Sequence, residues 1–229
     1  MDYDLSAIVT PYVTDYIREK TTHNNKLLLE LEEYAKENKV PIAEPETARL
    51  ASVLTKLVRP KKILEVGSAI GYSAIIMSDG LAPDGKIITL EYDPETVKIA
   101  RKNVERAGLS DKISVVEADA KDYLSYLDDD ESFDMIFLDG PKAHYLFMLD
   151  DAVRLLRKGG LLVSDNILFK GMTADDGHFA RRKVTIIHRL RDYIDALMAH
   201  PQLETSILSQ GDGVTLSIKT VSDKERFRG

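Results

Sequence analysis

Apolar residues in the first 60 positions recur with the period of an amphipathic helix. One set follows the i, i+3/i+4, i+7 spacing of a helix face and consists of Leu27, Leu28, Leu31, Tyr34 and Ala35. The same spacing recurs from Leu50 to Val58, and Pro60 ends it because proline cannot continue a helix. The stretch from Ile8 to Ile17 is also apolar enough to pack on the same subunit or on a neighbouring one. We therefore predict a helical N-terminal extension over residues 1–60.

From residue 62 onward, short apolar runs alternate with helical stretches. Because these runs are continuously apolar, they indicate strands that are covered on both faces of a sheet. We predict five such strands, at residues 63–66, 86–90, 113–117, 135–138 and 161–163. One helix follows the first strand and ends near Gly80. Another begins with Asp93 as its N-cap and Pro94 at its first position, and ends near Gly108.

The last two predicted strands, 205–208 and 214–218, are separated by the turn Gly211-Asp-Gly213, which is typical of a hairpin. The whole pattern predicts an α/β fold: a doubly wound, Rossmann-like sheet of about seven strands with an antiparallel C-terminal hairpin. The chain has no repeat and no long linker, so we predict one domain over residues 1–229, with an α/β catalytic core at 61–220.

Composition narrows the class of protein. The chain has 229 residues, of which 44% are hydrophobic, enough for one substantial core. No apolar run approaches the roughly 18 residues that a bilayer span needs, and the first residues lack the features of a signal peptide. We therefore expect a cytoplasmic protein without membrane contact. The absence of cysteine excludes disulfides, thiolate metal sites and a cysteine nucleophile.

Charge is acidic overall but locally basic. The net charge of −7 argues against a general nucleic-acid coat. One stretch nevertheless contains six basic residues against two acidic ones, and the basic residues are Lys170, Arg181, Arg182, Lys183, Arg189 and Arg191. Either this stretch is an ordinary solvated helix face, or it contacts an anionic partner.

A glycine turn, Glu65-Val-Gly67-Ser-Ala-Ile-Gly71-Tyr-Ser73, follows the first strand. Glycines allow a sharp turn and a close approach to a ligand at the start of the next helix. Glu91 ends the next strand, 24 residues after Gly67, where a carboxylate can accept hydrogen bonds from both ribose hydroxyls. Asp119-Ala120, after the third strand, is placed to meet an adenine edge. The alternative for Glu91 is a solvated acid at a strand end.

The turn does not match the dinucleotide pattern. Its spacing is G-x-x-x-G, whereas a pyrophosphate needs the middle glycine of G-x-G-x-x-G. S-adenosylmethionine has no phosphate and carries a sulfonium cation. The acidic residues Glu65 and Asp139 would attract this cation, whereas they would repel a pyrophosphate. The charges therefore favour a methyl donor over a dinucleotide.

Hard oxygen ligands follow two later strands: Asp139 after one and Asp165-Asn166 after the other. In an open α/β sheet, ligands bind beyond the carboxyl ends of the strands. Two carboxylates and an amide can hold Mg²⁺ or another divalent cation there. Together with the cofactor turn, this site indicates metal-assisted group transfer onto an oxygen.

The motifs that carry these sites occur together in one known family. The runs Glu65–Ser73, Glu91-Tyr-Asp-Pro, Leu138-Asp-Gly-Pro-Lys142 and Asp165-Asn166 resemble the cation-dependent O-methyltransferases of the catechol and caffeoyl-CoA type. These enzymes have a class I, S-adenosylmethionine-dependent methyltransferase fold, and the resemblance covers about residues 40–219. Within that group, four further segments resemble the bacterial tRNA 5-hydroxyuridine methyltransferases: 163–171, the acidic-then-basic stretch up to Lys183, 197–201 and 211–213.

The resemblance implies roles for individual residues. It implies a metal bound by Asp139, Asp165 and Asn166, and a catalytic pair of Lys142 and Asp139. The cofactor pocket that we expect comprises Glu65, Gly67, Ser68, Gly71, Ser73, Glu91, Asp119, Ala120 and Asp139. Small-molecule members commonly carry threonine at the position of Ser68, and their aromatic gating residues have no counterpart that we can place here.

The identity of the methyl acceptor stays open between two substrate classes. A cation chelated by two adjacent oxygens lowers the pKa of the acceptor hydroxyl, and both catechol and 5-hydroxyuracil offer such oxygens. We favour the tRNA anticodon region as substrate, with Lys170, Arg181, Arg182 and Lys183 contacting phosphates. A small-molecule O-methyltransferase is the alternative. A non-catalytic S-adenosylmethionine binder would not need the metal site, and a dehydrogenase would need NAD. The spare apolar surface of the N-terminal extension indicates a homodimer.

Overall fold

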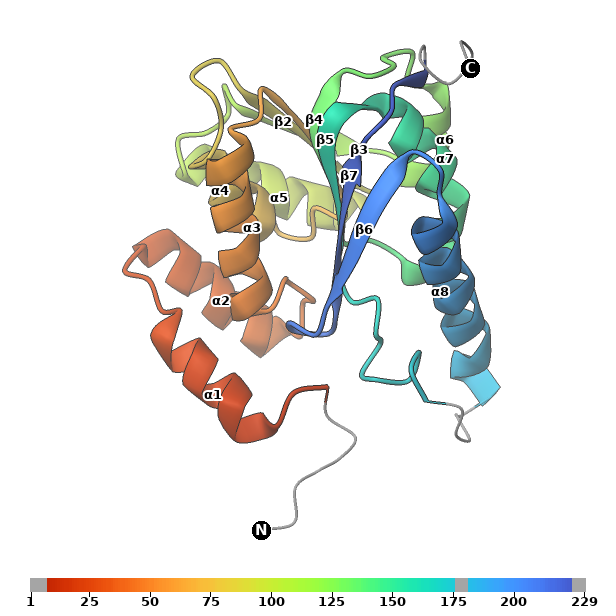
Figure 1. Ribbon diagram of the computed structural model, residues 1–229. Coiled ribbons are helices and arrows are strands. Elements are labelled where there is room, and N and C mark those ends of the chain that lie inside the picture. The colour runs from red at the N-terminus through yellow and green to blue at the C-terminus, as the bar shows by residue number, and fades with distance from the viewer. Residues whose placement is uncertain (1–7, 176–180, 224–229) are drawn as a thin grey trace.

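A computed structural model describes residues 8–175 and 181–223, with the side chains of residues 181 and 182 left out of the description. Its centre is a seven-stranded sheet in the order β3-β2-β1-β4-β5-β7-β6 (Figure 1). The strands are β1 (Lys62–Val66), β2 (Lys86–Glu91), β3 (Ile113–Glu117), β4 (Phe133–Leu138), β5 (Leu156–Ser164), β6 (Leu203–Leu208) and β7 (Val214–Lys219). The first five are parallel, and β7 is antiparallel to both β5 and β6. The predicted doubly wound sheet with its C-terminal hairpin is confirmed.

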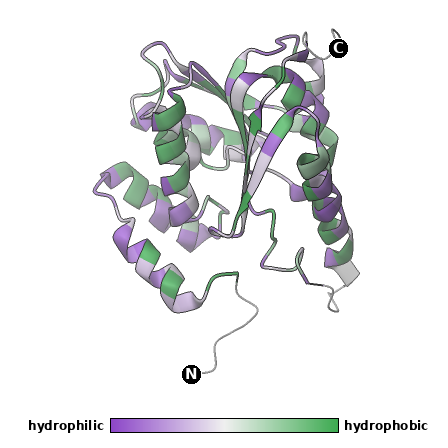
Figure 2. Cartoon of the chain, viewed as in Figure 1, coloured by the Kyte–Doolittle hydropathy of each residue, from purple (hydrophilic) through white to green (hydrophobic). Residues whose placement is uncertain are grey.

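Helices cover both faces of the sheet (Figure 1). One face carries α2 (Lys26–Asn38), α3 (Pro45–Val58), α4 (Tyr72–Ser78) and α5 (Pro94–Arg106). The other carries α6 (Ala120–Tyr126), α7 (Tyr145–Leu155) and α8 (Arg181–Ala199). Along β1, Ile63 packs into the first core and Leu64 into the second, so successive residues of one strand are buried on opposite sides. This is why the strands are continuously apolar, whereas α8 alternates between hydrophobic and hydrophilic residues (Figure 2).

Local signals set the boundaries of several elements. The Asp93 carboxylate accepts a hydrogen bond from the Thr96 amide at 2.8 Å, and Pro94 opens α5, as predicted. Strand β5 is longer than the predicted 161–163. Its first half, Leu156–Gly160, is polar and glycine-rich, and the pairing with β4 shifts register there. The sequence pattern therefore revealed only the buried half of this strand.

The N-terminal extension is helical, as predicted, but its first helix packs loosely. Helix α1 (Pro11–Lys20) has no buried residue, and Tyr12 and Tyr16 are each 61% exposed. Arg18 attaches α1 to the start of α3 by ion pairs with Glu44 at 2.6 Å and Glu46 at 2.9 Å. The homodimer remains a prediction. None of the described helices is long and apolar enough to cross a membrane.

Gly67 lies where the glycine turn meets the end of β4. Its φ is +95°, and a Cβ atom there would lie 2.3 Å from the Asp139 carbonyl oxygen. Gly108 also has a positive φ, +67°, but a Cβ atom there would meet nothing within 4 Å. The two glycines therefore share the backbone conformation and differ in the space around it.

We expect Gly108→Ala to lower the free energy of unfolding by about 1–2 kcal/mol, the cost of a left-handed conformation at a residue with a Cβ atom. Gly67→Ala should cost clearly more, because a backbone carbonyl must also move. Urea unfolding of both variants measures the difference. Equal losses would show that the close approach at Gly67 is not a constraint on the fold.

Glu65 is a carboxyl group buried inside the sheet. Its side chain is fully buried in β1, and the Thr89 hydroxyl of β2 donates a hydrogen bond to Oε2 at 2.5 Å. Burial raises the pKa of Glu65 to about 7, against the lowering effect of neighbouring hydroxyl groups. The folded protein therefore binds this proton more tightly than the unfolded chain does.

This shift predicts a pH-dependent stability. The contribution of Glu65 to the free energy of unfolding is fully present below its ordinary pKa of 4.5 and is lost as the pH rises to about 7. The reason is that the folded state must then give up a proton that it holds tightly. Glu65→Gln should remove that part of the pH dependence in urea unfolding at pH 5 and pH 8 with a chelator present. Glu117→Gln, at an exposed strand end, is the control. An unchanged pH dependence in Glu65→Gln would contradict the raised pKa.

Candidate active site

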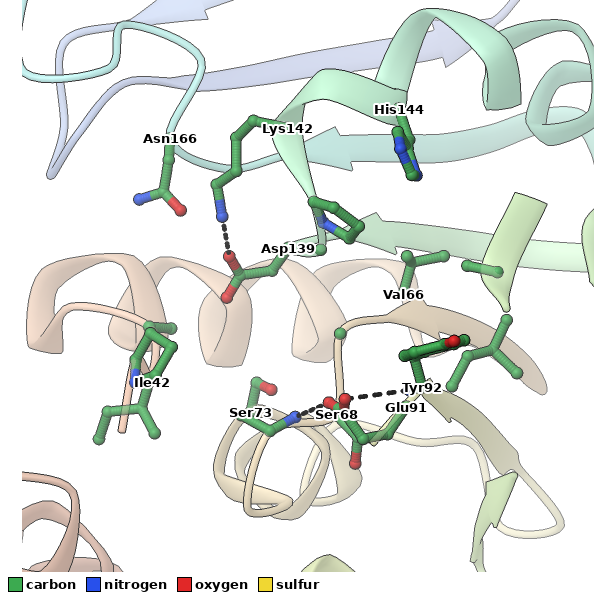
Figure 3. A pocket seen from close by; sticks show the side chains of 18 of the residues that line it. Ile42, Val66, Ser68, Ser73, Glu91, Tyr92, Asp139, Lys142, His144 and Asn166 are labelled. Carbon is green, nitrogen blue, oxygen red and sulfur yellow. Dashed lines mark hydrogen bonds and ion pairs between the residues drawn. The ribbon is translucent and has the colours of Figure 1, made fainter. Parts of the chain in front are cut away.

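A cavity of about 660 Å³ opens at the carboxyl ends of β1, β2 and β4 (Figure 3). The chain runs from β1 outward to β3 on one side and then continues with β4 on the other side of β1. Ligands of open α/β sheets bind at such a reversal of strand order. Segments from both halves of the chain line the cavity: 41–44, 66–69, 72–73, 90–92, 118–121, 139–142, His144, Met148 and Asn166.

Glu91 fixes the cofactor side of the cavity. Its Oε2 accepts a hydrogen bond from the Ala69 amide of the glycine turn at 3.0 Å. Its Oε1 accepts from the amides of Tyr92 at 3.0 Å and Asp93 at 3.1 Å. The carboxylate is therefore held by three backbone donors and still borders the cavity, which favours a cofactor contact over the alternative of a solvated acid at a strand end.

Several residues that line the cavity are apolar. Val66, Leu90 and Met148 line it, together with Ala118 and Ala120. Asp119 caps α6, accepting a hydrogen bond from the Lys121 amide at 2.9 Å. The combination of these apolar residues with two acids, Asp119 and Glu91, has the composition that a purine nucleoside needs.

Two acids form the second part of the candidate site. Asp139 follows β4 and Asp165 follows β5, adjacent strands whose ends meet at this edge. Lys142 donates to Asp139 Oδ1 at 3.1 Å (Figure 3). Asp165 Oδ1 accepts from the Asn166 amide at 2.7 Å, while its Oδ2 is buried without a hydrogen-bond partner. Asn166 has a left-handed φ of 56° and borders the cavity.

The electrostatics of this pair favour a cation. Burial raises the pKa of Asp139. Burial also raises the pKa of Asp165 to about 8, and the nearby charge of Asp139 adds to this increase. An unpartnered buried carboxylate oxygen facing another acid is costly unless a cation neutralises it. Across the described part of the chain, no three His, Cys, Asp or Glu side chains come together in a metal-binding arrangement. The candidate ligands are thus two carboxylates and the Asn166 amide, hard oxygen donors that fit Mg²⁺ or a similar ion.

The structure brings most of the predicted site residues together. Those that line the cavity are Gly67, Ser68, Ser73, Glu91, Asp119, Ala120, Asp139, Lys142 and Asn166. Glu65, Gly71 and Asp165 are not among the lining residues. Glu65 is fully buried and bonded to Thr89, so its role near the cofactor sulfonium stays a prediction. Gly71 has a φ of +85° and supports the cavity from the start of α4.

The predicted basic patch is only partly described. Lys170 is exposed, and Lys183 Nζ lies 5.9 Å from the ring centroid of Phe169, three residues beyond Asn166. The side chains of Arg181 and Arg182 lie outside the described residues. The four-residue patch therefore stays a prediction.

A second basic cluster was missed by the sequence reasoning. Phe147 is 51% exposed, and its ring centroid lies 5.7 Å from Lys121 Nζ and 5.3 Å from the guanidinium of Arg189. The ring of His144 meets it edge-on at 6.5 Å. Lys121 and His144 also line the cavity, so this cluster borders its opening. The three elements involved come together only in the folded chain, and no local motif indicates the cluster.

Other lining residues were also missed, for different reasons. Tyr72 and Tyr92 directly follow Gly71 and Glu91, and this adjacency was a usable signal. The segment 41–44 belongs to the N-terminal extension and reaches the cavity only because that extension packs beside the glycine turn (Figure 3, Ile42).

Comparison with known proteins identifies the family. The model of the O-methyltransferase family matches residues 18–220. Catechol O-methyltransferase of Niastella koreensis is 39% identical over 134 residues, which are 58% of this chain and 61% of that enzyme. This alignment thus spans less than two thirds of the relative's length. Caffeoyl-CoA O-methyltransferase 1 of Eucalyptus globulus is 33% identical over 172 residues, covering 72% of this chain and 69% of the plant enzyme.

A solved structure has the same fold. An O-methyltransferase from Bacillus cereus in complex with SAH matches with a TM-score of 0.80 at 25% identity, covering 91% of this chain and 97% of that one. These matches support the resemblance to the catechol and caffeoyl-CoA type; the closer resemblance to the tRNA enzymes stays a prediction. Because the family model extends from the first helix past the last strand, and the fold is that of a class I S-adenosylmethionine-dependent methyltransferase, this chain belongs to the O-methyltransferase family.

Proposed function

We propose that the protein transfers a methyl group from S-adenosylmethionine to a hydroxyl that has a second oxygen beside it, with the help of a divalent cation. The observation that carries this proposal is a pair of carboxyl groups at the ends of two adjacent strands: Asp139, which lines the cavity, and Asp165, which is fully buried. A protein that only bound the cofactor would gain nothing from a second buried acid with an unpartnered oxygen.

Each half of the cavity has a distinct task in this reaction. S-adenosylmethionine supplies an electrophilic methyl group, and a cation bound by Asp139, Asp165 and Asn166 supplies the Lewis acidity that favours an ionised acceptor hydroxyl. Glu91, held by its three backbone donors, orients the ribose. Fixing donor and acceptor in line can contribute about 7–11 kcal/mol in favourable cases.

Lys142 is the candidate base. It opens the short helix η1 (Lys142–His144), and its Nζ is 3.1 Å from Asp139 Oδ1, at the edge of the proposed ligand set. An acceptor oxygen bound there would lie within reach of this amine, which in its neutral form would take up the proton that the hydroxyl releases. The hydrogen bond that Nζ donates to Asp139 holds the lysine side chain in that position.

Two acceptor classes fit this chemistry. The names of the relatives from Niastella and Eucalyptus support a small molecule of the catechol or caffeoyl-CoA type. This class has the stronger support.

One observation favours tRNA containing 5-hydroxyuridine as the second candidate. Four basic residues near the cavity form no ion pair within residues 8–175 and 181–223: Lys121, Lys170, Lys183 and Arg189. Three of them, Lys121, Lys183 and Arg189, lie beside phenylalanine rings, an arrangement that suits an acceptor with phosphates and a flat base, as in single-stranded RNA loops. Simple catechols carry no phosphate, whereas the coenzyme A group of caffeoyl-CoA does, so this observation disfavours a free catechol only.

The first test is methyl transfer from labelled S-adenosylmethionine to three acceptors: catechol, caffeoyl-CoA, and tRNA carrying 5-hydroxyuridine. We expect transfer with Mg²⁺ and only background transfer with EDTA. Binding of S-adenosylmethionine, measured by calorimetry, should persist in EDTA, because Glu91 and the glycine turn hold the nucleoside without the cation. Full transfer in EDTA would exclude the metal-assisted reaction. Turnover of one acceptor class alone identifies the substrate class.

A charge reversal distinguishes phosphate-bearing acceptors from catechol. Lys183→Glu should raise KM for a phosphate-bearing acceptor and reduce the slope of log KM against log salt by roughly one unit for each phosphate that the lysine no longer neutralises. KM for catechol should not change. Lys36→Glu, exposed on α2 over the other face of the sheet, is the matched control. Equal KM values for tRNA in both variants would remove Lys183 from the acceptor surface.

A further inference from the structure

We propose that Tyr145 is a positioning residue for the cation: its hydroxyl holds the ends of β4 and β5 at the separation that Asp139 and Asp165 need to share one ion. This inference rests on the proposed function, because it concerns the same metal site. It assigns a task to a buried residue that does not border the cavity.

The hydroxyl group of Tyr145 contacts the backbone of the two segments that carry the proposed metal ligands. Its side chain is fully buried at the start of α7. The hydroxyl oxygen lies 2.9 Å from the Leu138 carbonyl oxygen and 3.2 Å from that of Asp165. Leu138 directly precedes Asp139, and Asp165 is itself a proposed ligand. One phenolic proton is therefore shared between the carbonyl groups of Leu138 and Asp165, which are next to the Cα atoms that carry the two proposed ligands.

The position of this bridge in the sheet explains why it matters. The Asp165 amide donates to the Leu138 carbonyl at 2.9 Å, the last backbone bond between these strands before their paths separate. Beyond it, one chain turns into Gly140-Pro141 and the other into the left-handed Asn166. A hydroxyl group that bonds both strands at this point of separation ties the two strand ends together.

Groups outside the ligand set commonly tune metal affinity in this way. Removing one that orients a ligand typically weakens metal binding by about 10–100-fold. A purely structural hydroxyl would affect stability without acting selectively on the cation.

The protein contains a matched control for that distinction. Tyr193 of α8 is equally buried, and its ring packs edge-on against that of Tyr145 at 5.3 Å. Its hydroxyl lies 2.6 Å from the Ser164 hydroxyl and contacts neither strand-end carbonyl. Tyr193→Phe therefore removes a buried, hydrogen-bonded hydroxyl from the same aromatic pair without removing the bridge.

The experiment compares Tyr145→Phe and Tyr193→Phe with the wild type in the presence of SAH. Mn²⁺ binding, followed by electron paramagnetic resonance, gives the dissociation constant directly, and calorimetry gives the affinity for SAH. We expect Tyr145→Phe to weaken Mn²⁺ binding by about tenfold or more, with SAH affinity unchanged and kcat restored by excess Mg²⁺. Tyr193→Phe should bind Mn²⁺ like the wild type.

Three results would overturn the inference. Wild-type Mn²⁺ affinity in Tyr145→Phe would show that the bridge does not set the ligand geometry. Equal weakening in both variants would show a general effect of removing a buried hydroxyl. Failure of the wild type to bind Mn²⁺ while it binds SAH would refute the metal site itself, and with it the proposed function.

Discussion

The site depends on the close approach of the glycine turn to the end of β4. The Asp139 amide donates to the Val66 carbonyl at 2.9 Å, and the Asp139 carbonyl lies where a side chain on residue 67 would begin. This contact joins the segment that holds the cofactor to the segment that carries the first proposed metal ligand. Donor and acceptor can meet in one cavity because the backbone here has room for no Cβ atom.

Around this contact, the structure buries acidic groups that an ordinary core would avoid. Glu65, Asp139 and Asp165 lie within or at the end of three adjacent strands, and burial raises the pKa of each. Such shifts are concentrated at functional sites, where stability is lost locally for chemistry. The apolar layers on both faces of the sheet compensate for this loss, since most strand residues next to the acids are buried and apolar.

The sequence predicted the parts of the molecule that depend on local rules. Continuous apolar runs identified the five parallel strands, the Gly211-Asp-Gly213 turn identified the C-terminal hairpin, and the Asp93-Pro94 pair indicated the start of α5. The glycine turn, Glu91, Asp139 and Asn166 were found because they end or follow strands, and a single sequence reveals where strands end. Interactions between distant segments were not predictable in this way. The bridge by Tyr145, the cluster around Phe147 and the contribution of residues 41–44 each require the packing of elements that no periodicity relates. Glu65 shows the converse limit: its type and position suited a cofactor contact, but its side chain is fully buried beside the hydroxyl groups of Thr89 and Ser73.

The attachment of helix α1 has a consequence for how acceptor preference can change. Arg18 is ion-paired with Glu44, which lines the cavity, and with Glu46, whose carbonyl oxygen accepts a hydrogen bond from Gln210 before the C-terminal hairpin turn. Part of the cavity lining therefore belongs to the N-terminal extension, which the loosely packed helix α1 contacts through Arg18, whereas the proposed cofactor and metal residues lie at the ends of sheet strands. Substitutions in the extension can reshape the entrance for a new acceptor while the machinery for methyl transfer is inherited intact.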